Sequence, residues 1–405
     1  MRTLNGPYAQ VITFKDAPLK GPLKNGSLAI IENAGILSEN GKILAVGPFR
    51  ELVDKAEKTE KEESRACVFP GFIDCHTHLI WGGSRAADFE RRNSGFTYQE
   101  ILKEGGGIFD TVQKTREATD EELKTGLSKR IRRHLNDGIT TVEIKSGYGI
   151  SPEHEIRLLK LIRETKNIAS IDIVSTFLGA HVSPKHKSKE AYLQELTEEA
   201  LPVISELKLA GRVDAFVEPE AFPVEIVRPF MEKVRSMGFR LTLHVGQFTP
   251  DGVKLACQLN ALSADHLESI TDKEIDMLAK SDTMGVALPG ASLGLGMGFT
   301  PARKILDRGG SLAIATDWNP GSAPQGDLLA QSSLLATYEK LSSAEIFAGI
   351  TYRAANALGL SDRGRIKTGM LADFVVFPTA DYREVLYQMG RMSPVKVYKN
   401  GNKIN

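Results

Sequence analysis

Near residue 70 the chain reads Val68-Phe69-Pro70-Gly71-Phe72-Ile73-Asp74-Cys75-His76-Thr77-His78, an apolar run that ends in two histidines one residue apart. Alternation along a strand puts His76 and His78 on one face and turns Thr77 away. Two imidazoles at the end of a strand can bind one metal ion and leave room for a carboxylate, a third histidine and a water. A pair of hydrogen-bonded histidines explains an isolated His-x-His equally well, so the rest of the chain decides its meaning.

The composition is that of an ordinary globular protein. Of the 405 residues, 41% are hydrophobic and 25% are charged, which suits one large domain and a smaller one. Lys+Arg and Asp+Glu are equal at 51 each, so the charge indicates neither a nucleic acid nor an anionic membrane as partner. The three cysteines, Cys67, Cys75 and Cys257, show no CxxC spacing, and no signal-peptide core or membrane-spanning apolar run occurs. We expect a cytoplasmic protein.

From Cys67 onward, strand-like and helix-like segments alternate. The predicted strands are 67–75, 139–144, 171–178, 213–217, 239–243, 261–264, 283–288 and 311–316. The amphipathic segments between them include 120–136, 152–166, 189–209, 224–237, 271–279 and 301–308. Apolar strands alternating with helices predict a parallel sheet, and eight units predict a closed (β/α)8 TIM-like barrel of the α/β class. The absence of Gly-x-Gly-x-x-Gly after the first strand disfavours a dinucleotide-binding fold.

Further strand-like pieces flank the barrel at both ends. Before it lie 9–14, 26–32 and two strands joined by the turn signal Ser38-Glu39-Asn40-Gly41, followed by a charged helical or loop-like segment at 51–65. After it come helical segments at 327–339 and 343–358 and strands at 371–377 and 395–401. We therefore expect a small composite β-sandwich domain built from both termini. The expected domain ranges are 1–65 and 363–405 for this domain and 66–362 for the barrel.

Six metal-competent side chains follow the predicted strands at their C-terminal ends: His76, His78, His181, His244, His266 and Asp317. The C-terminal ends of all strands in a barrel open onto one face, where the active site is built. These side chains are therefore expected to converge. The remaining histidines, His134, His154 and His186, lie in helical or charged loop segments, where a surface position is the default.

The simplest arrangement is one divalent ion held by His76, His78, His244 and Asp317, with water completing the shell. Zn²⁺ suits these ligands, and Fe²⁺ or Mn²⁺ can use them too. Such an ion makes hydroxide available near neutral pH; Asp317 can hold it, and His266 is placed to move a proton. The alternative for His266 is a supporting role or a place on a second metal. A two-metal site usually needs a bridging carboxylate or a modified lysine. The fourth predicted strand ends without a lysine, which favours a single ion, whereas Glu218 at that end could serve as the bridging carboxylate for a second ion.

These residues, in this order, resemble the metal-dependent amidohydrolase superfamily. The matching segments are 70–78, 82–85, 105–108, 143–149, 176–181, 262–267, 288–290 and 317–322. The more specific words are Lys145-Ser146-Gly147-Tyr148-Gly149, Phe177-Leu178-Gly179-Ala180-His181 and Asn319-Pro320-Gly321-Ser322. They resemble a branch of that superfamily that opens the ring amide of an imidazolone propionate in histidine degradation. The resemblance covers the barrel and both flanks.

The resemblance implies the same four metal ligands, a small-molecule substrate and a homodimer. It also implies substrate contacts from Arg85, Tyr98, Tyr148, His181, Asn319, Gly321 and Ser322. Arg85 offers a planar, bidentate partner for a propionate, whereas Arg91 and Arg92 are expected to form surface ion pairs. Tyr148 and His181 can donate to ring or carboxylate oxygens.

After His244 the chain departs from the family pattern. Val245-Gly246-Gln247 stands where an acidic residue and then Glu or Gln are common. Gln247 keeps a hydrogen-bonding group for the ring but is no base, so the proton transfers are assigned to Asp317 and His266.

Two other functions fit parts of the pattern. Another amidohydrolase, of the formiminoglutamate deiminase or purine/pyrimidine deaminase type, would share the metal ligands and differ in substrate. A non-catalytic scaffold on the same fold would be expected to have lost ligands, and all four are present.

Overall fold

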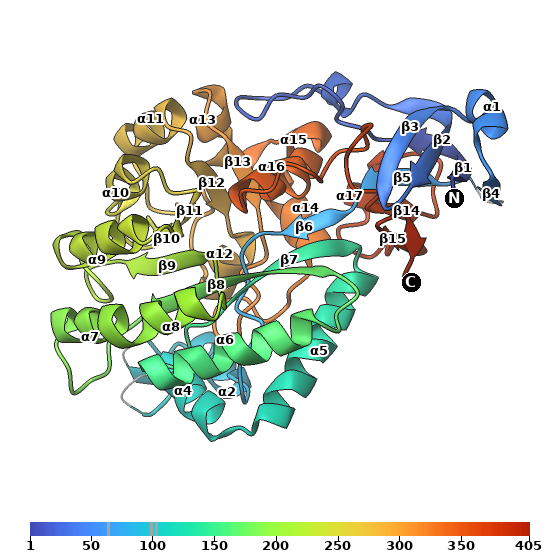
Figure 1. Ribbon diagram of the computed structural model, residues 1–405. Coiled ribbons are helices and arrows are strands. Elements are labelled where there is room, and N and C mark those ends of the chain that lie inside the picture. The colour runs from blue at the N-terminus through green and yellow to red at the C-terminus, as the bar shows by residue number, and fades with distance from the viewer. Residues whose placement is uncertain (63–64, 98–99, 102–103) are drawn as a thin grey trace.

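The computed structural model describes residues 1–62, 65–97, 100–101 and 104–405, which form two sheets (Figure 1). One is a ring of eight parallel strands with helices around it. The other gathers strands from the beginning and the end of the chain, and both termini lie beside it. The predicted TIM-like (β/α)8 barrel and the separate β domain built from both termini are confirmed.

The barrel strands follow one another in chain order around the ring. They are β6 (Phe72–Asp74), β7 (Ile139–Lys145), β8 (Asp172–Ala180), β9 (Arg212–Val217), β10 (Arg240–Val245), β11 (Ser263–His266), β12 (Met284–Ala287) and β13 (Leu312–Ile314). Each pairs in parallel with its neighbour. Their residues are almost all buried, as expected for strands covered on both faces.

Helices cover the outside of the ring. They are α2 (Ala86–Asn93), α4 (Ile108–Glu117), α5 (Asp120–Asn136), α6 (Pro152–Lys166), α7 (Lys189–Glu195), α8 (Leu201–Glu206), α9 (Val224–Ser236), α10 (Val253–Gln258), α11 (Asp272–Lys280), α12 (Pro289–Leu295), α13 (Ala302–Asp307), α14 (Leu328–Glu339), α15 (Ser343–Gly349) and α16 (Tyr352–Ala357). A capping box between Thr119 and Glu122 starts α5. The single helix predicted at 343–358 is wrong, because Thr351 (φ −130°, ψ −105°) separates α15 from α16. In the described part of the chain, no helix is both long and apolar enough to cross a membrane.

The terminal sheet has the order β16-β15-β14-β5-β1-β2-β3, and β4 pairs with β1. Its strands are β1 (Thr3–Val11), β2 (Ile31–Glu39), β3 (Lys42–Pro48), β4 (Lys58–Lys61), β5 (Cys67–Pro70), β14 (Phe374–Phe377), β15 (Lys396–Lys399) and β16 (Asn402–Lys403). The predicted hairpin is present: Asn40 and Gly41 have φ of +51° and +79°, as a type I′ turn requires. The strand predicted at 26–32 is wrong, since a 3-10 turn occupies Asn25–Leu28.

The apolar run before the two histidines is not one strand, as predicted, but two. β5 pairs with β1 and β14 of the terminal sheet, whereas β6 opens the barrel. The change of sheet occurs at Gly71. Its N–H donates to the backbone carbonyl of Asp373 in the terminal domain, whereas the N–H of Phe72 donates to the backbone carbonyl of Gly138 beside the barrel. We therefore propose to start the barrel domain at Gly71 rather than at residue 66.

Gly71→Ala is expected to destabilise the fold at this crossing. A Cβ there would lie 2.3 Å from Oγ1 and 3.0 Å from Cβ of Thr140, closer than packed atoms allow. We expect the free energy of unfolding to fall by about 1–3 kcal/mol, the usual cost of overpacking, measured by urea denaturation. Gly211→Ala is the matched control, because no other described residue has an atom within 4 Å of a Cβ at that position. Equal stability of the two variants would contradict the close approach.

The first and last barrel strands meet just beyond their ends. The N–H of Asp317 donates to the carbonyl of His76 at 3.0 Å, and the N–H of His78 donates to the carbonyl of Trp318 at 3.0 Å. Deeper in this seam, Asp74 accepts hydrogen bonds from the N–H (3.1 Å) and the hydroxyl (2.6 Å) of Thr316. The segments that carry the predicted metal ligands therefore also close the ring.

The predicted surface position of His134 is wrong. His134 lies on α5 with no exposed surface, and its Nε2 is 3.2 Å from Oδ2 of Asp74. Its ring also packs edge-on against Trp318, with ring centroids 4.8 Å apart. His134 thus supports the seam from the outside of the barrel.

Candidate metal centre and active site

The structure brings the six predicted side chains together at the C-terminal face of the barrel. His76 and His78 follow β6, His244 lies in β10, His266 ends β11, and Asp317 follows β13. Ligand atoms of His76, His78 and Asp317 lie within 4.8 Å of one another, as do those of His76, His244 and His266. His181 follows β8, and its ring stacks on that of His78, with centroids 5.4 Å apart.

Three of these side chains, His76, His78 and Asp317, have the spacing of a metal site, and His244 lies beside His78. Nε2 of His78 is 3.3 Å and Nε2 of His76 is 3.5 Å from Oδ1 of Asp317, and Nε2 of His244 is 3.4 Å from Nε2 of His78. A tetrahedron with ligands about 2.1 Å from its centre has edges of about 3.4 Å. All four side chains are at most 4% exposed. The buried His76, His78 and Asp317 at this spacing, with the His244 imidazole next to His78, fit a divalent metal ion.

Buried carboxylates orient two of the imidazoles from behind. Oδ2 of Asp265 is 2.6 Å from Nδ1 of His76, and Oδ2 of Asp214 is 3.0 Å from Nδ1 of His244. A proton on Nδ1 leaves the lone pair of Nε2 free for a metal. Burial lowers the pKa of His244 to about 4 and that of His76 well below its usual range, so both rings are neutral near pH 7.

The loop after β13 fixes Asp317. Asp317 adopts φ of +51°, and its Oδ2 accepts a hydrogen bond from the amide of Asn319 at 2.9 Å, with the Ser322 hydroxyl 3.4 Å away. Oδ1 of Asn319 accepts the N–H groups of Gly321 (2.7 Å) and Ser322 (2.8 Å). Burial acts to raise the pKa of Asp317, but the neighbouring imidazoles, His78 first, hold it below its usual value. Oδ1 thus faces the histidines as a carboxylate.

His266 lies beside the four-residue set in a strained backbone. His266 and Leu267 have φ of +89° and +71°, a left-handed conformation that is unfavourable for residues other than glycine. Its Nδ1 is 3.5 Å from Oε2 of Glu268, and its ring centroid is 5.2 Å from that of His244. Both a proton-transfer role and a place on a metal fit this position.

The predicted substrate residues lie around the histidines. Tyr148 is buried, with its ring centroid 5.9 Å from that of His78. Nδ1 of His181 is 2.9 Å from the carbonyl of Gly147, and burial lowers the pKa of His181 to about 3. A neutral His181 therefore donates to that carbonyl through Nδ1 and presents Nε2 as an acceptor, not as the expected donor. Tyr98 lies outside the described residues.

Arg85 and Arg92 both reach the Gly321 loop. Nε of Arg85 donates to Asp88 at 2.5 Å, and a Cβ added at Gly321 would lie 3.0 Å from its Nη1. Arg92 was expected in a surface ion pair, but its Nη2 donates to the carbonyl of Gly321 at 3.2 Å. Arg91 does form the expected surface pair, with Glu104 at 3.1 Å.

Glu218 and Gly246 shape the loop after His244. Oε1 of Glu218 accepts the N–H groups of Gln247 (3.1 Å) and Phe248 (3.0 Å), and Oε2 accepts the Thr249 hydroxyl (2.7 Å). Both oxygens of Glu218, the carboxylate considered as a ligand of a second ion, are therefore engaged in hydrogen bonds to this loop. Gly246 has φ of +73°, and a Cβ there would lie 2.6 Å from Cγ2 of Ile270, so the acidic residue common in the family does not fit. Gln247 is buried.

A buried charge cluster beneath the ligands escaped the sequence analysis. It consists of Glu143, Lys145, Arg212, Asp214 and Asp265. Burial acts to raise the pKa of Asp265, and the ammonium group of Lys145 opposes that shift. Glu268, beside His266, was also missed. The residues of the cluster are charged positions within largely apolar strands, and Glu268 follows His266 by two residues. Both features are visible in the sequence and could have pointed to these residues.

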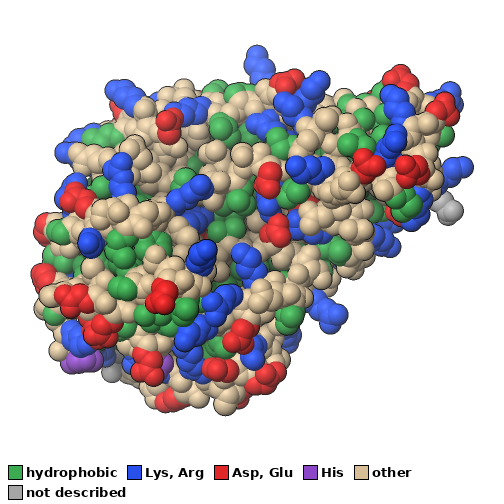
Figure 2. Space-filling view, in the orientation of Figure 1, with side chains coloured by type: hydrophobic (Ala, Val, Ile, Leu, Met, Phe, Trp, Pro, Cys, Tyr) green, Lys and Arg blue, Asp and Glu red, His purple; other side chains and the backbone are tan. Residues whose placement is uncertain are grey.

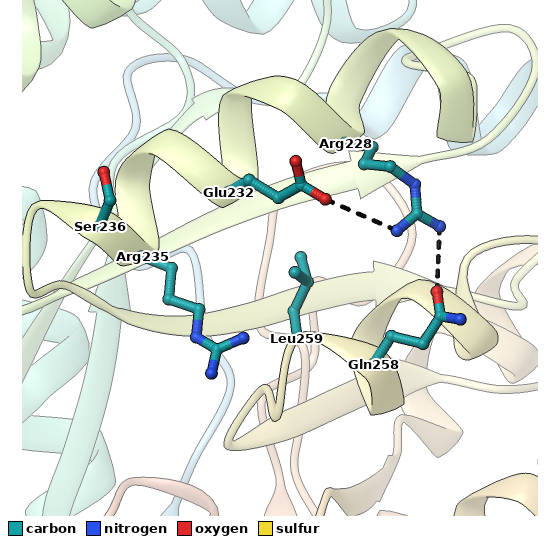
Figure 3. A pocket seen from close by; sticks show the side chains of 6 residues that line it. All are labelled: Arg228, Glu232, Arg235, Ser236, Gln258 and Leu259. Carbon is teal, nitrogen blue, oxygen red and sulfur yellow. Dashed lines mark hydrogen bonds and ion pairs between the residues drawn. The ribbon is translucent and has the colours of Figure 1, made fainter.

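Away from the predicted site, a depression lies on the outer surface between α9 and α10 (Figure 3). It is lined by Arg228, Glu232, Arg235, Ser236, Gln258 and Leu259. Arg228 spans it, with Nη1 3.8 Å from Glu232 and Nη2 donating to Gln258 at 3.1 Å. Charged side chains of both signs are mixed over this face of the molecule (Figure 2). Among the predicted site residues that the structure describes, none lines this depression.

The sequence profile of the amidohydrolase family matches residues 67–248 and 241–404. The chain therefore belongs to the amidohydrolase family. Within it, the chain is similar to curated imidazolonepropionases: those of Bdellovibrio bacteriovorus (38% identity, 94% of this chain and 91% of the relative), Solibacter usitatus (40%, 95% and 93%) and Deinococcus radiodurans (39%, 98% and 98%).

Solved structures share the fold at lower identity. Guanine deaminase of E. coli superposes with a TM-score of 0.74 at 17% identity, over 100% of this chain and 99% of that one. Atrazine chlorohydrolase from Arthrobacter aurescens complexed with zinc has a TM-score of 0.71 at 17% identity, over 99% and 95%. An adenosine deaminase from Xanthomonas campestris with bound zinc has a TM-score of 0.72 at 18% identity, over 99% and 92%.

Proposed function

We propose that the protein hydrolyses the ring amide C–N bond of 4-imidazolone-5-propanoate to give N-formimino-L-glutamate. The observation that carries the proposal is the buried cluster of His76, His78 and Asp317, with His244 3.4 Å from His78, in a chain 38–40% identical to imidazolonepropionases. We further propose one ion, Zn²⁺ or Fe²⁺, held by these four residues. A divalent ion there supplies a Lewis acid that polarises a carbonyl and lowers the pKa of water toward about 7.

The side chains divide the remaining work. Asp317 Oδ1 accepts the proton of the attacking water, and His266 or Asp317 delivers a proton to the ring nitrogen that leaves the carbonyl carbon. Nε2 of His181 accepts a hydrogen bond from a ring N–H, and the Tyr148 hydroxyl donates to the substrate. Asn319 and Ser322 hold Asp317 in place, so these two residues act through the carboxylate as well as on the substrate.

The cell location and assembly belong to the same proposal. Cys67, Cys75 and Cys257 are free thiols, which suits a reducing cytoplasm. The equal numbers of acidic and basic residues suit a small-molecule enzyme without nucleic-acid or membrane partners. A homodimer is proposed from the family resemblance and from the prevalence of twofold symmetry among oligomers.

The function is tested by the ultraviolet-monitored loss of freshly prepared imidazolone propionate, with metal-analysed protein and a chelated control. We expect metal-dependent loss with formation of formiminoglutamate. The second candidate is a deaminase acting on an exocyclic C–N bond, since guanine and adenosine deaminases share the fold. Ammonia release from guanine, adenosine or formiminoglutamate, without imidazolone turnover, would replace the proposal by this candidate.

Arg85→Ala is expected to raise KM more than it lowers kcat, because the guanidinium lies beside the Gly321 loop and binds the propionate. The loss of a charged hydrogen-bonding partner costs about 1.5–3 kcal/mol, which corresponds to roughly a 10- to 100-fold increase in KM. Steady-state kinetics measure both parameters. Arg91→Ala is the control, since its ion pair with Glu104 lies on the surface. An unchanged KM would remove Arg85 from the carboxylate pocket.

A further inference from the structure

We propose that Lys145 is a positioning residue of the metal centre, because its ammonium group fixes the two carboxylates that orient His76 and His244. The proposal deepens the proposed function and rests on it only for the identity of the ligands. Lys145 ends β7 and lies beneath the ligand set with no exposed surface.

The geometry links one ammonium to two ligands on different strands. Nζ of Lys145 is 2.8 Å from Oδ2 of Asp214 and 3.9 Å from Oδ2 of Asp265. The same two oxygens face the ligands: Oδ2 of Asp214 is 3.0 Å from Nδ1 of His244, and Oδ2 of Asp265 is 2.6 Å from Nδ1 of His76. Each ligand is thus two contacts away from Lys145, through one carboxylate oxygen.

The charges of the cluster make this link specific to Lys145. A third carboxylate, Glu143, has its Oε2 2.8 Å from the ammonium, and Arg212 lies on the far side, 3.5 Å from Oε1 of Glu143. Three buried carboxylates therefore face two cations, and Lys145 is the cation placed against both ligand-supporting ones. Without it, Asp214 and Asp265 would repel each other in a medium of low dielectric constant and move the imidazoles they hold.

The main chain at this point gives an independent anchor. The N–H of Lys145 donates to the carbonyl of Thr77 at 3.0 Å, and the Thr77 hydroxyl donates to the carbonyl of Glu143 at 2.5 Å. Thr77 stands between the two histidine ligands. Because these bonds involve backbone atoms of β7, a change of the Lys145 side chain leaves them in place and tests the ammonium group alone.

The test compares K145M with the double variant K145M/E143Q as apoproteins, which are then titrated with metal. K145M leaves one cation against three carboxylates, so we expect a lower Tm. The double variant has one cation against two carboxylates, the wild-type net charge, so Tm should recover. We expect both variants to bind Zn²⁺ about 10- to 100-fold more weakly in competition with a chromophoric chelator. The absorption spectrum of bound Co²⁺ should shift in both, because methionine cannot hold Asp214 and Asp265.

E143Q alone separates position from charge, since it keeps the ammonium between Asp214 and Asp265, and it should retain Zn²⁺ affinity within a few-fold. Recovered Tm with wild-type affinity in the double variant would overturn the proposal, because Lys145 would then only balance buried charge. Failure of the double variant to fold would overturn it as well. Metal titration needs no substrate, so it separates this proposal from the proposed reaction. If K145M bound Zn²⁺ more weakly and the wild-type enzyme did not turn over imidazolone propionate, the proposed reaction would be overturned and the role of Lys145 would stand.

Discussion

Asp317→Asn is expected to lower kcat by about 10³-fold, since general acid–base groups contribute about 10²- to 10⁴-fold. Asparagine keeps the size of the side chain, but its amide oxygen is drawn to the donors of Asn319 and Ser322, so its NH2 group faces the imidazoles and cannot accept the proton of water. The amide of Asn319 and the hydroxyl of Ser322 point at Oδ2 of Asp317, so the loop holds this side chain with Oδ1 toward His76 and His78. Turnover at saturating metal and substrate measures the effect.

The measurement needs the metal content of each preparation beside the rate. Asp251→Asn is the matched control, because Asp251 is an exposed carboxylate on the loop after β10 and should keep wild-type turnover. A fully loaded Asp317→Asn enzyme that turns over within a few-fold of wild type would show that another group takes the proton.

His266→Ala is expected to fold, to retain its metal and to lose about 10²- to 10⁴-fold in kcat. The ring lies beside the four proposed ligands, and Glu268 stands 3.5 Å from its Nδ1, which suits a group that exchanges a proton with the leaving nitrogen. The strained φ at His266 and Leu267 indicates that the fold holds this ring in place at a cost.

Metal analysis of the same variant distinguishes the two roles open to His266. His186→Ala serves as control, since His186 is exposed and should be silent. A parallel loss of metal and activity would make His266 a ligand, as its position beside His76 and His244 allows. Near-normal turnover would remove it from the proton transfers.

Repeated local signals made the barrel predictable from sequence. The helices at 120–136 and 152–166 carry N-cap residues and regular apolar spacing, and the structure reproduces both ranges. The split of 67–75 at Gly71 was not predictable in the same way, because both halves are apolar and buried. Only the partners show that β5 belongs to one sheet and β6 to the other.

The site was predictable where side chains follow strands, and less so where they support one another. The convergence of the histidines follows from barrel geometry, which gives all strand ends one face. His134 was misplaced because α5 is rich in charge, although Leu127, Ile131 and His134 share its buried face. Lys145 and its carboxylates depend on contacts between β7, β9 and β11, and no spacing along the chain encodes those contacts.

The ligands on either side of the seam give metal loading a further consequence. His76 and His78 follow the first barrel strand and Asp317 follows the last, so an ion held by all three would link these two strands and keep the barrel closed. Because such an ion binds the closed barrel and not the opened one, its binding free energy adds to the free energy required to separate the two strands. Proteolysis and amide exchange at His78 and Asp317, whose N–H groups cross the seam, would then follow metal supply. In a cell, shortage of the ion would shorten the lifetime of the protein as well as silence it.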